Sequence, residues 1–153
     1  MGAMNVIQPH REKYFGLYWS LADAAATQSV ADRAKVGCVI VTRTGMISVG
    51  WNGMPPGLPN RCENQWILDE GVPRQKTDPR VIHAERNAID KMTREGVSTR
   101  GAILFTTLSP CMECAKSIAT LELDCVYIRD LHDCMQGLLL LTDLGVPWIK
   151  VKQ

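Results

Sequence analysis

Two short motifs constrain this sequence more than any other feature, because they must meet in space to form one site. The first is His83-Ala84-Glu85 and the second is Pro110-Cys111-Met112-Glu113-Cys114. Cys111 and Cys114 are three residues apart, so on a helix both sulfurs lie on one face. Together with the His83 imidazole they supply three ligands to one tetrahedral metal ion, and zinc is the metal that such ligands suit.

Glu85 makes the predicted site catalytic rather than structural. Three protein ligands leave the fourth position on the metal for water. Glu85 is two residues from His83, which is the wrong spacing for a fourth ligand on a helix, but it is close enough to exchange protons with that water. Each motif alone is weaker, because His-x-Glu occurs on many amphipathic helices and a lone C-x-x-C is equally a redox pair or half of a structural zinc site. Pro110 favours the first turn of a helix, which places both cysteines where the helix dipole favours thiolate.

Length and composition indicate one globular domain. Met1-Gly2-Ala3 resembles a cloning scar, so a single domain is expected over residues 4–153. No signal peptide is recognisable and no apolar run approaches the roughly 18 residues that a membrane span needs, so we expect a cytoplasmic protein with no membrane partner. Two of the six cysteines are then metal ligands, and the other four, Cys38, Cys62, Cys125 and Cys134, are reduced thiols, with Cys38 and Cys125 in the core. A net charge of +1 without a Lys/Arg block disfavours nucleic acid and favours a small substrate.

Hydrophobic periodicity predicts helices and strands in alternation. Apolar residues recur every three or four positions over 10–28, which predicts a helix with Tyr14, Leu17, Tyr18, Leu21 and Ala25 buried. The runs 36–41 and 46–51 predict a hairpin around a Thr44-Gly45 turn. A second helix is predicted over 81–94, with His83 and Glu85 in its first turn.

The remaining elements complete a three-layer α/β/α domain. Strands are predicted at 102–107, 125–128 and 148–151, and helices from Cys111 onward and over 133–144. Strands that alternate with helices form such layers, and the metal ligands then lie at helix N-termini along one edge of the sheet.

Two loops are candidates for binding. Arg33 and Lys35 lie just before a central strand, where they form either a solvated loop or a cationic cradle for a substrate phosphate. Residues 52–80 form a connection far longer than usual and rich in Gly and Pro, which predicts a lid or nucleotide-binding loop, with disorder as the alternative. Its apolar residues give it something to pack with: Trp66, Ile67, Leu68 and Val72.

From Tyr14 onward the chain resembles the deoxycytidylate (dCMP) deaminases of the cytidine deaminase superfamily. The zinc motif alone indicates the superfamily. The loop Gly50-Trp51-Asn52-Gly53-Met54-Pro55, the long insertion after it and Leu131-His132-Asp133 narrow the resemblance to the dCMP branch. The resemblance implies a cytidine deaminase-like fold around a five-stranded mixed sheet. The chain departs from the family at Trp51 and Leu131, where Tyr is frequent, and at Cys134, where Ser is frequent.

This resemblance implies zinc-dependent hydrolysis of dCMP to dUMP and ammonia, which supplies dUMP for thymidylate synthesis. Glu85 would carry a proton from water to ring nitrogen 3 and then to the leaving amino group. Asn52 would bind the deoxyribose 3′-hydroxyl, and a backbone carbonyl near Leu108 or Ser109 would accept from the exocyclic amine. His132 is a further candidate for the 5′-phosphate.

The resemblance also implies regulation. Such enzymes are commonly homohexamers that dCTP activates and dTTP inhibits, each bound with magnesium. The candidate effector residues here are Gly53, Met54, Asn64 and Arg94. An unregulated loop that only covers the active site is the alternative.

Three other functions compete with dCMP deamination. A tRNA adenosine deaminase should have a basic face, which the near-neutral charge disfavours. A free cytidine deaminase has no use for a phosphate cradle. A non-catalytic zinc-binding scaffold would more often use a fourth Cys or His in the place of Glu85.

Overall fold

The structure, a computed structural model, describes residues 6–152, with the backbone alone described at Asn64 and Gln65. The predicted scar at Met1-Gly2-Ala3 lies outside these residues. In chain order the elements are η1 (Gln8–His10), η2 (Glu12–Tyr14), α1 (Phe15–Thr27), β1 (Gly37–Val41), β2 (Ile47–Trp51), β3 (Glu63–Asp69), β4 (Val72–Thr77), α2 (Ala84–Arg94), β5 (Ile103–Leu108), α3 (Met112–Ala119), β6 (Cys125–Asp130), α4 (Gln136–Asp143) and β7 (Trp148–Lys150).

The central sheet has five strands in the order β2-β1-β5-β6-β7. β1 pairs antiparallel with both β2 and β5, whereas β5, β6 and β7 pair in parallel. Gly45 has a φ of 92° in the turn that joins β1 to β2, which confirms the predicted hairpin. The mixed five-stranded sheet expected from the sequence is therefore confirmed, each strand lying within two residues of its predicted position.

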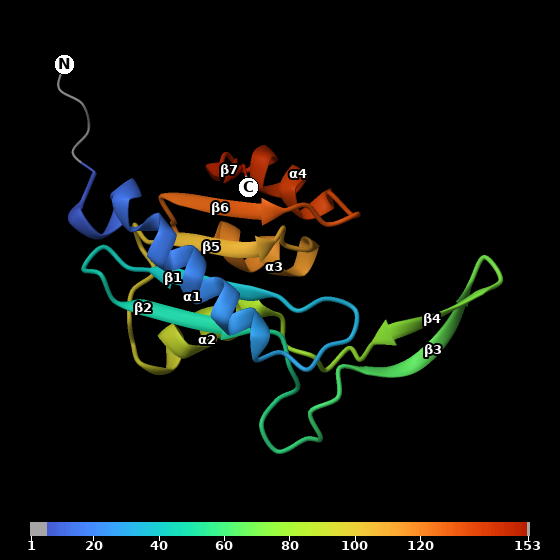
Figure 1. The fold of residues 1–153 in the computed structure, drawn as a ribbon. Coiled ribbons are helices and arrows are strands. Elements are labelled where there is room, and N and C mark those ends of the chain that lie inside the picture. The colour runs from blue at the N-terminus through green and yellow to red at the C-terminus, as the bar shows by residue number, and fades with distance from the viewer. Residues whose placement is uncertain (1–5, 153) are drawn as a thin grey trace.

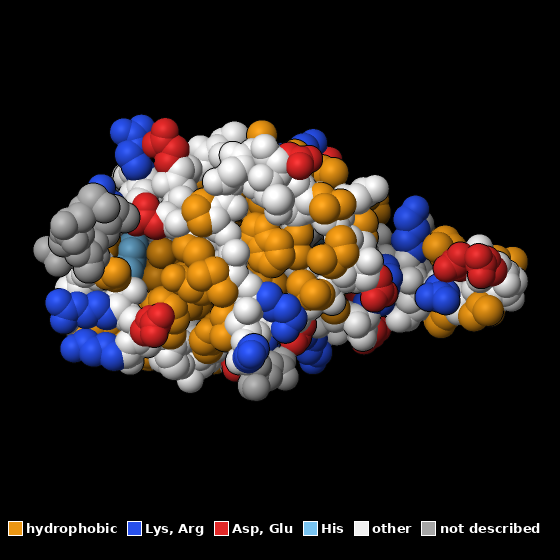
Figure 2. Space-filling model, turned by 90° about the horizontal axis from the view of Figure 1, so that it is seen from above, with side chains coloured by type: hydrophobic (Ala, Val, Ile, Leu, Met, Phe, Trp, Pro, Cys, Tyr) orange, Lys and Arg blue, Asp and Glu red, His pale blue; other side chains and the backbone are white. Residues whose placement is uncertain are grey.

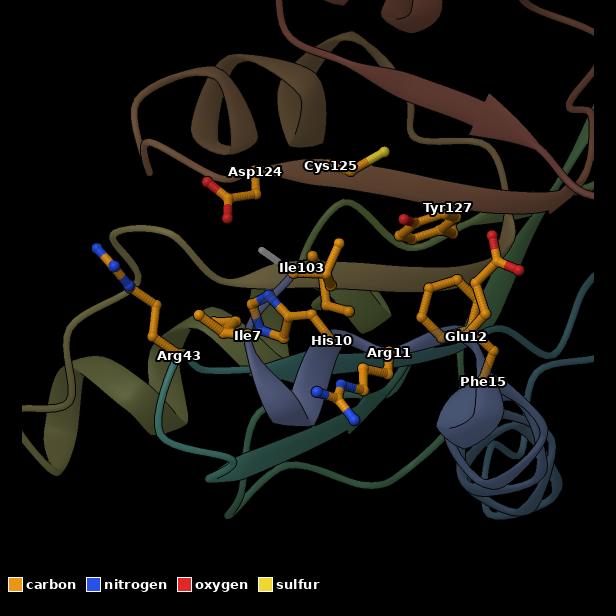
Figure 3. Close-up of a pocket in the computed structure, with 11 residues that line it drawn as sticks. Ile7, His10, Arg11, Glu12, Phe15, Arg43, Ile103, Asp124, Cys125 and Tyr127 are labelled. Atoms are coloured by element: carbon orange, nitrogen blue, oxygen red, sulfur yellow. The ribbon is translucent and has the colours of Figure 1, made fainter. Parts of the chain in front are cut away.

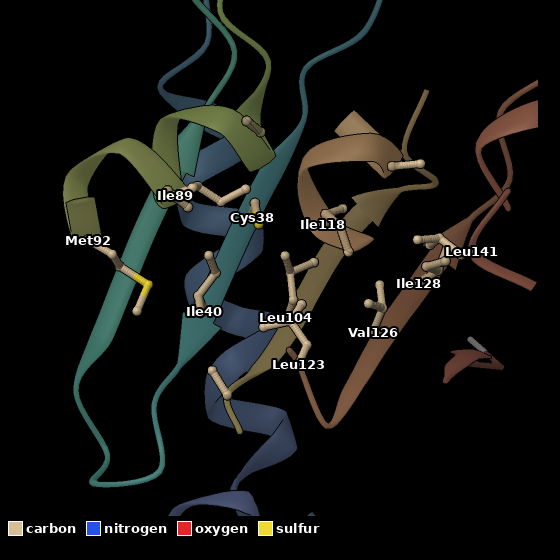
Figure 4. Close-up of a cluster of buried hydrophobic side chains, with 14 of the residues drawn as sticks. Cys38, Ile40, Ile89, Met92, Leu104, Ile118, Leu123, Val126, Ile128 and Leu141 are labelled. Atoms are coloured by element: carbon tan, nitrogen blue, oxygen red, sulfur yellow. The ribbon is translucent and has the colours of Figure 1, made fainter. Parts of the chain in front are cut away.

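Helices cover both faces of this sheet, so the domain has three layers (Figure 1). On one face α2, α3 and α4 bury Ile89, Ile118 and Leu141 against Ile40 and Leu104 of the sheet (Figure 4). Cys38 belongs to this core and Cys125 to the core on the opposite face, as predicted. Because β1, β5 and β6 are covered on both sides, most of their side chains are apolar, and the polar ones, Thr106, Thr107, Arg129 and Asp130, lie towards the carboxyl ends of β5 and β6.

The other face is covered by α1 through a group of aromatic rings. The Phe105 ring lies 4.9–5.4 Å from those of Phe15, Tyr18, Trp19 and Tyr127. Such contacts are worth about 0.5–1.5 kcal/mol each beyond the area they bury. Phe105 therefore joins the first helix to the centre of the sheet.

The predicted first helix is shorter than expected. Residues 8–14 form two 3-10 turns, and α1 begins at Phe15. Tyr18, Ala22 and Ala25 face the sheet, whereas Leu17 is 54% exposed, so its predicted burial was wrong. Ala22 lies on the side of α1 that packs against β1, where the helix backbone approaches Gly37 closely.

The long connection after β2 contains a second sheet that was not predicted. β3 and β4 pair antiparallel around a Glu70-Gly71 turn, in which both residues have positive φ. This hairpin projects from the body of the molecule (Figures 1 and 2). The expectation that its apolar residues pack was wrong, because Trp66 is 68% and Leu68 76% exposed, with Ile67 and Val72 also exposed. None of the described helices is long and apolar enough to cross a membrane.

Candidate metal centre and active site

The three predicted metal ligands lie at the starts of two neighbouring helices. His83 is the N-cap of α2 and Cys111 the N-cap of α3, both with extended backbones, and their carbonyls accept the first helical bonds from Asn87 and Ala115. Cys114 lies in the first turn of α3. The expectation that His83 lies within the first helical turn was therefore wrong by one residue, and Pro110 precedes the cap rather than following it.

The three donor atoms fit a tetrahedral zinc site. His83 Nδ1 lies 3.4 Å from the Sγ atoms of both Cys111 and Cys114, and all three atoms lie within 4.8 Å of one another. Sulfur and nitrogen ligands at zinc distances in a tetrahedron lie about 3.6 Å apart. Two thiols and one imidazole are also the ligands of catalytic zinc sites that keep one position open.

The environment of the sulfurs favours one negative charge before any metal binds. Hydrogen bonds with Cys114 and His83 lower the pKa of Cys111 to about 3. The neighbouring Cys111 and burial raise the pKa of Cys114, and the hydrogen bond with Cys111 raises the pKa of His83. A metal cation is the group that offsets the repulsion between two such thiolates.

Glu85 lies in the first turn of α2 and is 4% exposed. Burial raises the pKa of its carboxyl, although a hydrogen bond with Cys114 and the charge of His83 oppose this effect. A carboxyl group in such a place, beside the metal ligands, is suited to take up and release a proton.

Two glycines allow the helices to come this close. A Cβ on Gly50 would lie 2.3 Å from the carbonyl oxygen of Ala84, so only glycine lets α2 begin directly on β2. A Cβ on Gly137 would lie 2.1 Å from the carbonyl oxygen of Pro110, which lets α4 approach the start of α3. Both close approaches fix the backbone around the metal ligands.

A hollow of about 120 Å³ opens beside the ligands at the carboxyl ends of β5 and β6. Three of the predicted substrate residues line it together with Glu85: Asn52, Ser109 and His132. The other lining residues are Val36, Thr77, Val81, His83, Ala84, Leu108 and Cys111. The structure thus brings together predicted residues that are far apart in the sequence.

Hydrogen bonds hold these lining residues in place. Asn52 Oδ1 accepts from the Val36 N–H at 2.9 Å, and its amide nitrogen donates to the Ala34 carbonyl at 2.8 Å. Ser109 is buried, and its hydroxyl accepts from the His132 N–H at 2.7 Å. His132 Nδ1 accepts from the Cys134 N–H at 3.0 Å, so its Nε2 is the ring atom that carries the hydrogen in the neutral tautomer.

Arg33 and Lys35 do not line the hollow. Both side chains are exposed, and Arg33 donates to the hydroxyl of Thr77, which is itself a lining residue, at 3.4 Å. Arg33 therefore lies one residue removed from the cavity wall, and Lys35 directly precedes the lining residue Val36.

The three candidate effector residues whose side chains are described, Gly53, Met54 and Arg94, do not lie together. Gly53 pairs through its backbone with Ile82, and Met54 packs in a small core with Ala31, Cys62 and Val81. Arg94 is at the far end of α2, an eleven-residue helix and so about 16 Å long. Nothing is described of the Asn64 side chain.

Thr77 and Val81 line the hollow but were not predicted to do so. Thr77 is the last residue of the unpredicted β4, and Val81 lies within the predicted helix 81–94, which begins only at Ala84. The pairing of β3 with β4 places Thr77 at the hollow, and no local pattern in the sequence marks that pairing.

A second cavity, of about 560 Å³, lies far from the metal ligands on the α1 face of the sheet. Apolar side chains of Ile7, Phe15 and Tyr127 line it with the charged Arg43 and Asp124 (Figure 3). It is larger than the hollow at the metal ligands, but it contains none of the predicted catalytic groups, so size does not identify the site.

Known proteins resemble the chain in both sequence and structure. The family model of the cytidine and deoxycytidylate deaminase zinc-binding region matches residues 13–129. The deoxycytidylate deaminase of Enterobacteria phage T4 is 37% identical, with 56% of this chain and 61% of the phage protein covered. That of Mus musculus is 32% identical, with 66% and 56% covered. The chain thus spans a little over half the length of these curated relatives.

A solved structure matches over nearly all of its length. The dCMP deaminase of cyanophage S-TIM5, in complex with dCMP and dUMP, is 36% identical with a TM-score of 0.80. The match covers 92% of this chain and 98% of that one. The zinc-ligand geometry, the family match over most of the chain and this structural similarity together show that the chain belongs to the cytidine and deoxycytidylate deaminase family, on its deoxycytidylate branch.

Proposed function

We propose that this protein hydrolyses dCMP to dUMP and ammonia with a zinc ion held by His83, Cys111 and Cys114, and so supplies dUMP for thymidylate synthesis. The observation that carries the proposal is the buried Glu85 beside these three residues, in a hollow that Asn52 also lines. The similar cyanophage enzyme, solved with dCMP and dUMP, supports this choice of substrate.

Glu85 is the only acidic side chain among the residues that line the hollow. When bound there, zinc lowers the pKa of water to about 7 and so supplies hydroxide at neutral pH. In the proposed reaction Glu85 accepts the proton of the attacking water and delivers it to ring nitrogen 3 of the pyrimidine. The regenerated carboxylate then takes the second proton of the former water from the new hydroxyl on carbon 4 and gives it to the amino group, so that the C–N bond breaks, ammonia leaves and the carbonyl of dUMP forms.

Asn52, Ser109 and His132 are the proposed substrate contacts. The Asn52 amide nitrogen uses one hydrogen on Ala34, which leaves its second hydrogen for the deoxyribose 3′-hydroxyl. A backbone carbonyl at Leu108 or Ser109, which line the hollow at the carboxyl end of β5, is the proposed acceptor for the exocyclic amine, and His132 Nε2 is the proposed donor to the 5′-phosphate.

An ammonia-release assay with cytidine, deoxycytidine and dCMP tests the proposed reaction on zinc-loaded protein. Turnover should be largest with dCMP, because Arg33 and Lys35 are cations that a nucleoside leaves unused. Equal turnover of all three would point to a nucleoside deaminase instead. No ammonia from any of them, with zinc bound, would favour the non-catalytic scaffold.

Arg33 and Lys35 are the proposed phosphate residues, with His132. Replacing Arg33 and Lys35 together by Ala should raise KM for dCMP far more than KM for deoxycytidine, since only dCMP carries the phosphate. Equal changes for both substrates would remove this assignment.

The proposal also covers how the enzyme is regulated and how its copies assemble. We propose a cytoplasmic homohexamer that dCTP activates and dTTP inhibits, each bound with magnesium, built from one domain over residues 4–153. Exposed apolar side chains support association: Leu139 is 60%, Leu144 58% and Ile149 51% exposed. Figure 2 shows hydrophobic side chains gathered on one broad face. Gly53, Met54, Asn64 and Arg94 remain the proposed effector residues, of which Gly53 and Met54 directly follow the lining residue Asn52.

A dCMP saturation curve with and without each effector tests this regulation. The two nucleotides must bind unequally to two conformations, because a ligand with equal affinity for both shifts nothing. We expect a sigmoid curve that dCTP straightens and dTTP moves to higher dCMP concentration. A hyperbolic curve that neither nucleotide changes, measured together with a monomer mass by light scattering, would contradict the regulated oligomer.

A further inference from the structure

Glu63, the first residue of β3, is a buried carboxylate that lies outside the hollow. It is 4% exposed and accepts three short backbone contacts, from the Asp32 N–H at 3.0 and 3.1 Å and from the Arg33 N–H at 3.1 Å. Hydrogen bonds to an ionised acceptor are roughly twice as strong as neutral ones. Glu63 therefore fixes the backbone of a loop about thirty residues earlier in the chain.

The fixed loop is a wall of the hollow. Beyond Arg33, the same loop is held at Ala34 and Val36 by both ends of the Asn52 amide. Val36 and Asn52 line the hollow beside Glu85. The loop is thus clamped between Glu63 on one side and a proposed substrate-binding residue on the other.

The base of the hairpin makes a third contact with this loop. Thr77 lies opposite Glu63 in the β3–β4 pairing, accepts from the Arg33 guanidinium and lines the hollow. The hairpin base is itself closed by the Asp78 N–H, which donates to the Cys62 carbonyl at 2.7 Å. Two facing residues of the hairpin therefore hold the loop, although the hairpin tip is far from it.

We infer that Glu63 is a positioning residue for substrate binding: it holds loop 32–36 so that Val36, Asn52 and the cation of Arg33 meet the substrate in one fixed arrangement. Glu63 acts on binding rather than on chemistry, because it touches neither the metal ligands nor Glu85. The kinetic consequence depends on the proposed function, whereas the ordering of the loop does not.

Glu63→Gln tests this role with a minimal change of shape. An amide offers one oxygen to the two backbone donors and turns its own NH2 towards them, whereas a carboxylate only accepts. KM for dCMP should rise about tenfold, as expected for the loss of charge-assisted hydrogen bonds. kcat and zinc content should stay at the wild-type values, and KM should rise more for dCMP than for deoxycytidine.

Amide hydrogen exchange of Asp32 and Arg33 tests directly whether Glu63 orders the loop, and it does not depend on enzymatic activity. Both amides should exchange slowly in the wild type and at least about tenfold faster in Glu63→Gln. Glu70→Gln is the control, because it removes the same charge from the exposed turn of the same hairpin and should change neither KM nor exchange. Glu63→Asp, which keeps the carboxylate one methylene shorter, should give intermediate values, and it replaces Glu63→Gln if that variant does not fold.

Unchanged exchange at both amides in the variant would overturn the inference, as would a fall in kcat at constant KM. If the wild type has no activity on dCMP, the proposed function fails, and the exchange result alone still decides whether Glu63 orders the loop.

Discussion

The metal-binding end of the sheet and the β3–β4 hairpin are built in opposite ways. At the metal-binding end, two glycines let helix starts lie against strands and against each other, and Glu85 is buried with the ligands. In the hairpin, the strands pair with each other and leave Trp66 and Leu68 to solvent. A two-stranded hairpin alone is marginally stable in water, so its order comes from its base.

Different contacts fix the positions of the metal ligands and of the outer wall of the hollow. The metal ligands depend on helix caps packed on a core, and the outer wall of the hollow depends on hydrogen bonds from the hairpin base. Changes at the metal-binding end should therefore affect metal binding or folding. Changes in the hairpin should have large effects only at its base.

The largest expected effect follows removal of a metal ligand. Cys114→Ser should lose zinc and reduce turnover to background, because a serine hydroxyl is a poor zinc ligand and two ligands do not retain the ion. Zinc content by atomic emission, measured beside dCMP turnover, checks this. Full zinc occupancy in the variant would mean that the ion is held elsewhere.

The second-largest effect is expected when the Phe105 ring is removed from the aromatic cluster under α1. Phe105→Ala should destabilise the fold by about 3–5 kcal/mol, because Phe105 is fully buried and contacts four other rings. Denaturant unfolding measures the change. A loss below about 1 kcal/mol would show that the core collapses around the gap, so that packing does not hold this part of the molecule rigid.

Gly50→Ala should have a smaller but more local effect, of about 1–3 kcal/mol, because the new methyl group would overlap the carbonyl oxygen of Ala84. The shift of α2 should also lower turnover, since Glu85 follows directly after Ala84. Denaturant unfolding and kcat, measured on the same variant, test whether the loss of stability and the loss of turnover occur together. Lost stability with unchanged kcat would show that α2 moves without disturbing the site.

The smallest effect is expected at the hairpin tip. Trp66→Ser with Leu68→Ser should change stability by less than about 0.5 kcal/mol, because both side chains are already exposed. KM for dCMP should stay at the wild-type value. A loss above about 2 kcal/mol that depends on protein concentration would mean that another copy of the chain covers the tip.

Sequence patterns predicted the central domain well because its signals are local. Buried strands such as 37–41 are continuous apolar runs, and the spacing of Cys111 and Cys114 shows how they share a helix start. The hairpin has no such signal. Trp66, Ile67 and Leu68 break the alternation of a half-buried strand, and its turn uses Glu70 rather than Asn or Asp.

The parts of the site that were missed depend on contacts between distant segments. The sequence marks Arg33 and Lys35 by charge, but only the fold shows that Thr77 separates Arg33 from the hollow. Glu63 is inconspicuous in a polar segment, and its importance arises from backbone donors that lie thirty and thirty-one positions earlier. No periodicity or motif encodes such a pairing.

Glu85→Gln gives the most direct test of the central claim, that a buried carboxyl beside three metal ligands moves the proton in deamination. The amide has the same shape and leaves His83, Cys111 and Cys114 in place. Zinc content should equal that of the wild type, while kcat for dCMP falls by about a hundredfold to ten-thousandfold. Turnover near the wild-type rate in zinc-loaded Glu85→Gln would contradict the account.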